Sequence, residues 1–295
     1  MGLIWVVATV FASGFQVARN GLQRSLMVQT GPWGATLVRF LFGLPFSGLL
    51  AAILICAMPT VMPQFSPAFW AMAGLGGTAQ LLATAALLTA MRRAGFAVGT
   101  ALQQSSIPLA AVVGLVAFHD HLRPLAWLGV GLTSGALGLL TWPKQATGPK
   151  PRTGALFGLA SGLAFGFSLN AFRAASHALS PEHPIYGAVV SLVVVQALQS
   201  LALGGVLLVW RPQVMAAVLA SAQRSWGAGF CGALASTGWF IAVALAPAAP
   251  VRAVGVIEAP MAAVAGHRLF KERLRWPQLI AGAAVAAGVV MTALG

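Results

Sequence analysis

Charged side chains are scarce in this chain of 295 residues. Aspartate, glutamate, lysine and arginine together make up 7% of it, and only four of these residues are acids. A soluble domain carries about 25% charged residues. Hydrophobic residues reach 59%, with a mean hydropathy of +0.87. The composition therefore predicts a protein that folds in a lipid bilayer.

The groups that catalysis and metal binding require are few and dispersed. Cys56 and Cys231 lie in or beside apolar segments, and neither they nor the five histidines have the spacing of a metal site. The four acids stand at four separate places, which argues against an enzyme acting on lipids. The sequence has no Walker motif and no GxGxxG between a strand and a helix. We expect no metal, no cofactor, no ATP hydrolysis and no enzymatic activity.

Apolar runs of about 20 residues recur between short polar breaks, as in membrane-spanning helices. The sequence predicts an all-α integral membrane protein with ten transmembrane helices. They are expected over residues 3–20, 32–57, 69–91, 94–116 and 125–141, and over 154–172, 185–209, 226–246, 251–270 and 276–294. The polar, proline-rich and basic segment 143–153 separates two halves, 1–142 and 154–295.

The two halves repeat one another. SSIPLAAVVGLVAFHDHLR, ending at Arg123, matches IEAPMAAVAGHRLFKERLR, ending at Arg275, so that Pro108 pairs with Pro260. Because each half has an odd number of spans, the second copy must enter the membrane from the opposite side. The sequence thus predicts two inverted five-helix repeats around a central cavity.

The loop charges are uneven between the two expected sides. One side holds most of the 17 lysines and arginines, including the basic end of the second copy, and the other holds Arg123, Arg173 and Arg252. Loops rich in Lys and Arg face the cytoplasm, so both termini are expected outside it. The net charge of +13 is scattered through these loops, and it does not indicate a nucleic-acid partner.

Polar residues recur on one face of the first span. Thr9, Ser13, Gln16 and Asn20 are spaced by three or four residues, and Ser168 matches Gln16 in the second half. Such a stripe must face protein or water. Hydrogen bonding between helices and an aqueous cavity both fit, and we expect the cavity. Its other expected lining residues are Gln80, Gln103 and Trp239, although a Trp in a packed core fits equally.

Two charged residues, Arg39 and Glu258, lie well inside the expected spans, whereas the arginines near span ends are counted with the loops. Arg39 either extends its side chain to the membrane interface or pairs with a carboxylate, of the substrate or of Glu258. Glu258 is a candidate substrate contact or proton carrier, or a structural partner of an arginine. Pro108 and Pro260 each free a backbone carbonyl, which suits a helix bend or a gate, although the small residues after them also favour packing.

Two stretches resemble a known family. P-x-A-A-V-x-G-x-x-x-F-x-[DE]-x-L-R runs from Pro108 and again from Pro260, and TLVRFLFG surrounds Arg39. Both resemble the EamA domains of the drug/metabolite transporter superfamily, over essentially the whole chain. The resemblance implies alternating access to a cavity enclosed by spans one to four and six to nine. Many members have both termini in the cytoplasm, the reverse of what the loop charges predict here.

The resemblance also implies a function, because characterised bacterial members include exporters of aromatic and other bulky amino acids. We therefore expect a secondary transporter of the bacterial inner membrane that exports neutral or aromatic amino acids and related small metabolites. Multidrug or cation efflux and exchange of sugar phosphates or nucleotide sugars are alternatives. The expected partners are a small-molecule substrate and the lipid bilayer, and the chain is expected to be a monomer or a weak homodimer. Proton coupling through Glu258 and uncoupled transport both fit the sequence.

Overall fold

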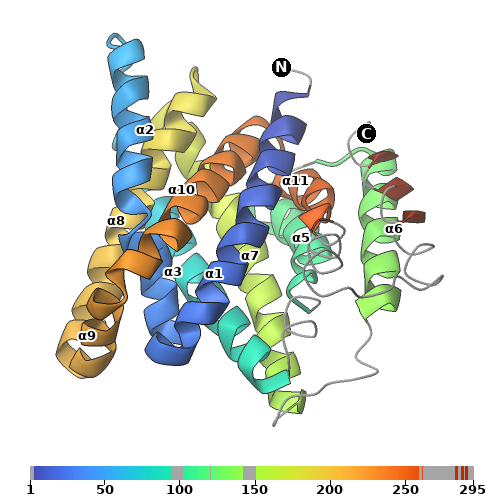
Figure 1. Cartoon of the computed structure of the whole chain (residues 1–295). Helices are drawn as coiled ribbons and strands as arrows, with labels where there is room; N and C mark the ends of the chain where they lie inside the picture. The colour runs from blue at the N-terminus through green and yellow to red at the C-terminus, as the bar shows by residue number, and fades with distance from the viewer. Residues whose placement is uncertain are drawn as a thin grey trace.

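A computed structural model describes residues 3–94, 102–119, 121–141, 151–258, 261, 283–284, 287–288 and 290–291. The described chain is 88% helical and contains no strand, which confirms the all-α class. Within the described residues, ten helices, several of them too short to span a membrane, are arranged as one bundle (Figure 1). They are α1 (Ile4–Leu41), α2 (Leu44–Ala57), α3 (Pro67–Ala94), α5 (Ser106–Ala117), α6 (Pro124–Thr141), α7 (Pro151–Leu179), α8 (Pro184–Trp210), α9 (Pro212–Ala220), α10 (Ala222–Leu245) and α11 (Ala248–Gly255).

Five helical segments are long and apolar enough to cross a membrane by their length and composition. They are Ser25–Ala57, Pro67–Ala94, Arg152–Leu179, Pro184–Trp210 and Ala222–Leu245, and a shorter apolar helix covers Ser106–Ala117. Their apolar character supports a membrane protein. Many of the helices begin with proline in the first turn, where its missing N–H costs nothing and its fixed φ suits the helix.

A break divides α1. Gly31 has φ 64° and ψ −179°, a conformation that favours glycine, and Pro32 follows it. The Gln23 amide donates to the Ala35 carbonyl at 2.8 Å, so the two parts of α1 lie together. The expected second span, 32–57, is therefore formed by the end of α1 and by α2, which begins after Gly43.

The most extensive packing in the bundle pairs α3 with α7 and α1 with α10. Small residues bring both pairs close together. A Cβ atom at Gly76 of α3 would lie 2.8 Å from the Phe172 ring of α7, and one at Gly238 of α10 would lie 2.9 Å from Ala12 Cβ of α1. At the edge of the bundle α5 and α11 pack together, with α6 beyond them (Figure 1).

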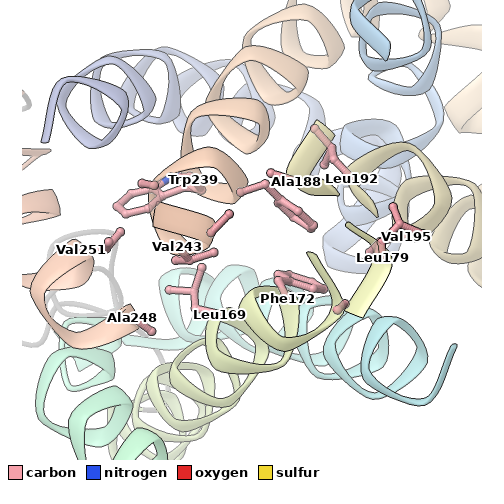
Figure 2. Close-up of a cluster of buried hydrophobic side chains, with 14 of the residues drawn as sticks. Leu169, Phe172, Leu179, Ala188, Leu192, Val195, Trp239, Val243, Ala248 and Val251 are labelled. Atoms are coloured by element: carbon pink, nitrogen blue, oxygen red, sulfur yellow. The ribbon is translucent and has the colours of Figure 1, made fainter. Parts of the chain in front are cut away.

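The largest core cluster fills the space between α7, α8, α10 and α11 (Figure 2). The rings of Phe172 and Phe240 stack with centroids 4.4 Å apart. The Trp239 indole lies at the edge of the cluster, next to Val251. Trp239 is therefore both a core residue and, as described below, part of the polar centre.

The same turn recurs in both halves just before the two paired prolines. The helix is interrupted at Gln104–Ser105, ahead of Pro108, and again at Val256–Ile257, ahead of Pro260. The Leu109 N–H bonds to the Ser105 carbonyl, and the Met261 N–H bonds equivalently to the Ile257 carbonyl. Pro108 is the third residue of α5, and Pro260 lies outside the described residues. A helix bend or gate at Pro108 and Pro260 stays a prediction.

The loops gather at two ends of the bundle. At one end the Gln64 N–H donates to the Leu179 carbonyl at 2.8 Å, and the α2–α3 and α7–α8 loops share a surface hollow of about 310 Å³. At the other end Gly31, Arg92 and Arg211 line one groove. Loops expected on the same side of the membrane therefore lie together.

Candidate functional site

Glu258 and three other buried side chains lie together. Gln16 comes from α1, Trp239 from α10 and Arg252 from α11, which ends just before Glu258. Gln16 Nε2 donates to Glu258 Oε1 at 2.6 Å, and Trp239 Nε1 donates to Gln16 Oε1 at 2.9 Å. Each end of the Gln16 amide thus has its own partner, which fixes the orientation of the amide.

Arg252 balances the charge of this carboxylate. Its Nη1 lies 3.8 Å from Glu258 Oε1, and its Cζ lies 5.1 Å from the centre of the Trp239 ring. Its Nε donates to Ser106 Oγ at 3.1 Å, and its Nη2 donates to Gln104 Oε1 at 3.2 Å. A buried ion pair is stable when its remaining N–H groups are also satisfied. One guanidinium therefore ties α11 to the turn before α5.

Arg39 is a second buried cation, near the end of α1. Its side chain is 2% exposed, so it does not extend to the interface. Its Nη1 donates to Thr84 Oγ1 at 3.2 Å, and its Nη2 donates to Ser236 Oγ at 3.4 Å. The Thr84 hydroxyl donates to the Gln80 carbonyl, which leaves its oxygen free to accept from Arg39. Arg39 therefore joins α1, α3 and α10 through hydroxyl groups.

Arg19 is a third buried cation and is 3% exposed. Its Nε and Nη2 both donate to Asn20 Oδ1, at 3.3 and 2.8 Å. A Cβ atom at Gly232 of α10 would lie 3.4 Å from Arg19 Cδ and 3.5 Å from Arg39 Cγ. The stems of the two arginines therefore pass over the same glycine.

A cavity of about 20 Å³ lies between these groups and is called the central cavity here. Such a volume holds roughly one water molecule. An amino acid fits only if the surrounding helices move apart. The lining residues are Gln16, Arg39, Gln80, Gln103, Phe165, Leu169, Ser236, Trp239, Phe240 and Arg252.

Most of the site residues predicted from sequence come together here. Gln16, Arg39, Gln80, Gln103 and Trp239 line the central cavity, and Glu258 lies against Gln16.

Ser168 differs from this group. Its hydroxyl is buried and donates to the carbonyl of Phe165 on its own helix, at 3.0 Å, and it is not among the lining residues. The carbonyl three residues earlier is always within reach of a helical serine. Position on the stripe therefore did not determine where this side chain points.

Sequence reasoning missed two arginines by assigning them to loops. Arg19 lies within α1, and Arg252 is the buried partner of Glu258. A signal for Arg19 was present, because it stands three residues after Gln16 on the polar side of the first span. Arg252 stands at the edge of an expected span, and only packing shows that it is buried.

A larger groove, of about 750 Å³, opens on the surface between α1, α3, α7 and α8. It is lined mainly by apolar side chains such as Leu82 and Val206, with Arg92, Arg93 and Arg211 also lining it. A small polar solute would find few partners there, so the central cavity is the better candidate site. Across the described segments, no three His, Cys, Asp or Glu side chains gather to hold a metal ion.

The fold and the site together define a helical membrane-type protein with a buried charged centre. No family model and no curated protein matches the chain. Among solved structures, 27 chains match it. One of them, described only as "Crystal structure of protein", is 18% identical, with a TM-score of 0.64, and the match covers 99% of this chain and 95% of the other. A likeness at that identity shows a shared fold alone.

Proposed function

We propose that this protein is a secondary transporter of the bacterial inner membrane that exports amino acids by alternating access. It has ten transmembrane helices in two inverted repeats, as the sequence predicts. The packing of α1 on α10 and of α7 on α3 supports the repeat, because the expected first and eighth spans correspond to the sixth and third. The recurring turn before Pro108 and Pro260 supports it as well.

The observation that carries the proposal is the central cavity. Hydrogen-bonding groups from α1, α3 and α10 and the guanidinium of Arg252 converge on it, deep in an otherwise apolar bundle. Polar and charged groups inside a membrane protein are costly and mark pathways for substrates. Arg39 is the group that binds the substrate carboxylate, by charge-assisted hydrogen bonds. Opening the small cavity to one face at a time gives alternating access.

Exchange of sugar phosphates is the second candidate. It requires several cations in the cavity, and the lining contains both Arg39 and Arg252. Efflux of hydrophobic cations is disfavoured, because the buried arginines outnumber the buried acid in the described part of the chain. A cation entering this site would meet repulsion rather than a counter-charge.

Counterflow into liposomes tests the proposal. Purified protein is reconstituted with one unlabelled compound inside, chosen from neutral, aromatic and charged amino acids, a sugar phosphate, a nucleotide sugar and a hydrophobic cation. Saturable uptake of a labelled amino acid, driven by internal amino acid, is the expected result. Exchange of the sugar phosphate or nucleotide sugar alone would establish the second candidate, and accumulation of the cation would overturn both.

A further inference from the structure

The buried charges of the described bundle do not balance. Arg19, Arg39 and Arg252 are buried, whereas Glu258 is the one buried acid of the described residues. Glu258 lies against Arg252 and its charge also acts on Arg19, so three buried cations share one carboxylate within the described residues, and none acts on Arg39 there. Hydroxyl and amide partners replace lost water hydrogen bonds, but they do not cancel a charge. Two positive charges therefore remain uncompensated.

Each of the two arginines also has a buried N–H group that makes no hydrogen bond. Arg19 Nη1 and Arg39 Nε are buried and have no hydrogen-bond partner among the described residues. A buried N–H left without an acceptor costs about 1–3 kcal/mol, and more when the group is charged. The two stems lie together over Gly232, and Arg39 lines the central cavity. These features are those of a prepared anion site rather than of a packed core.

We propose that Arg19 and Arg39 together bind the two negatively charged groups of one substrate, in the first place the two carboxylates of a dicarboxylic amino acid. The inference rests on the proposed function and narrows its substrate class. A guanidinium binds a carboxylate through parallel N–H bonds, so two guanidiniums bind two carboxylates, or the several oxygens of one phosphate.

A neutral amino acid fits this site less well. Every amino acid brings an ammonium group for which the described lining of the central cavity contains no acid, so the second carboxylate makes the difference. Glu258 Oε1 already accepts from Gln16 and lies against Arg252. A neutral amino acid would leave one of the two guanidiniums uncompensated, whereas a second carboxylate balances both.

Counterflow with three matched acids tests the inference. Glutamate and glutamine differ by one charge at nearly equal size, and glutarate lacks the ammonium group. We expect glutamate and glutarate to exchange with an apparent affinity at least about tenfold higher than that of glutamine, the effect of one charge-assisted hydrogen bond. Arg19→Gln and Arg39→Gln should each remove this preference. Arg224→Gln, at an exposed arginine, is the matched control and should keep it.

Thermal unfolding separates a binding role from a structural one. Because Arg19 is one of three buried cations that share one carboxylate, Arg19→Gln should unfold no earlier than the native protein while losing the rise in Tm that glutarate produces. An arginine that only holds the helices together would show the opposite, with a lower Tm and an undiminished response to glutarate.

The outcomes distinguish the inference from the proposed function. Exchange of glutamine at least as good as that of glutamate would overturn the Arg19–Arg39 site and leave the amino acid exporter standing. Exchange of glucose 6-phosphate but of no amino acid would keep the Arg19–Arg39 site and remove the exporter. Stabilisation by glutarate without exchange of any compound would keep the site and overturn transport. No exchange and no stabilisation would overturn both.

Discussion

Glu258 stands between two different partners, an uncharged amide and a cation. Gln16 approaches its Oε1 to 2.6 Å and Arg252 to 3.8 Å. Replacing the carboxylate by an amide keeps the shape of the side chain and leaves Arg252 as a third buried cation without an acid. The structural interpretation of Glu258 thus has direct support in these contacts, and a proton-carrying role stays a prediction.

Glu258→Gln should lower the free energy of unfolding by about 3 kcal/mol, the cost of removing one partner of a buried ion pair. Thermal unfolding in detergent, followed by tryptophan fluorescence, measures the change. The double variant Glu258→Gln with Arg252→Gln should recover most of the loss, because it leaves no new unpaired charge. The exposed acid Glu182 provides the control, since Glu182→Gln should change little. Equal losses in the single and double variants would argue against the pair.

The Glu258→Gln variant also tests whether transport is coupled to protons. If Glu258 carries a proton, Glu258→Gln should abolish the pH dependence of amino acid exchange in liposomes. Transport with an unchanged rate and an unchanged pH profile would exclude that role and leave uncoupled exchange.

At the scale of helices, glycines determine how closely α10 approaches α1. A Cβ atom at Gly229 would overlap the backbone carbonyl of Phe42, just after α1 ends. The backbone of α10 at Gly229 is in contact with the backbone at Phe42, and backbone atoms cannot move aside as the end of a flexible side chain could. Gly227, in the same helix, is exposed, and a Cβ atom there would lie 3.6 Å from Leu22 Cδ1, an ordinary contact.

Gly229→Ala should therefore destabilise the protein by about 1–3 kcal/mol through overpacking. Gly227→Ala is the matched control, and it should be neutral or gain up to about 1 kcal/mol from the higher helix propensity of alanine. Thermal unfolding of the two variants under identical conditions provides the comparison. If Gly229→Ala were as stable as Gly227→Ala, the close approach of α10 to Phe42 would not be a constraint on the bundle.

The sequence predicted much of the local structure, for physical reasons. The helical class follows from the length of the apolar runs, and the spacing of Thr9, Ser13 and Gln16 on one face is fixed by the helical period. The residues that the helical period could not place are those near expected span ends. Arg19 was taken for a loop residue because the sequence does not reveal that α1 continues to Gly31.

The features that the sequence did not predict depend on contacts between helices that are distant in the sequence. Arg252 is buried because α11 packs on α5, and its partners Gln104 and Ser106 lie far away in the sequence. The Ser168 hydroxyl donates to a carbonyl of its own helix, whereas Gln16, its expected counterpart, lines the central cavity. Repeated sequence positions therefore do not guarantee repeated contacts.

At the scale of the whole molecule, the orientation in the membrane is the prediction that follows from charge. The end of the bundle with Arg92, Arg93 and Arg211 is expected in the cytoplasm, and the end with Gln64 and the α7–α8 loop outside it.

Labelling of single cysteines tests this orientation. In a variant in which Cys56 and Cys231 are replaced by serine, Gln64→Cys should react with a membrane-impermeant maleimide in intact cells. Gln223→Cys, also exposed but at the other end, should react only after lysis. The reverse labelling pattern would place the Gln64 end of the bundle in the cytoplasm and the Gln223 end outside it. Both chain termini would then lie in the cytoplasm, as in many proteins with EamA domains. Stability in detergent should be unchanged in both variants, because both positions are exposed.

The contacts of Arg252 have a consequence for the energy of the proposed transport cycle. Its guanidinium contacts Ser106 and Glu258, which correspond to each other in the two repeats predicted from the sequence, yet Arg252 belongs to one of these repeats only. If the two halves were identical, a twofold rotation would relate the inward-open and outward-open conformations, and they would have equal energy. A single arginine cannot be shared equally by the two halves, so the two conformations differ in energy. The proposed carrier then binds its substrate with different apparent affinities on its two faces, while the concentration gradient still sets the direction of net flow.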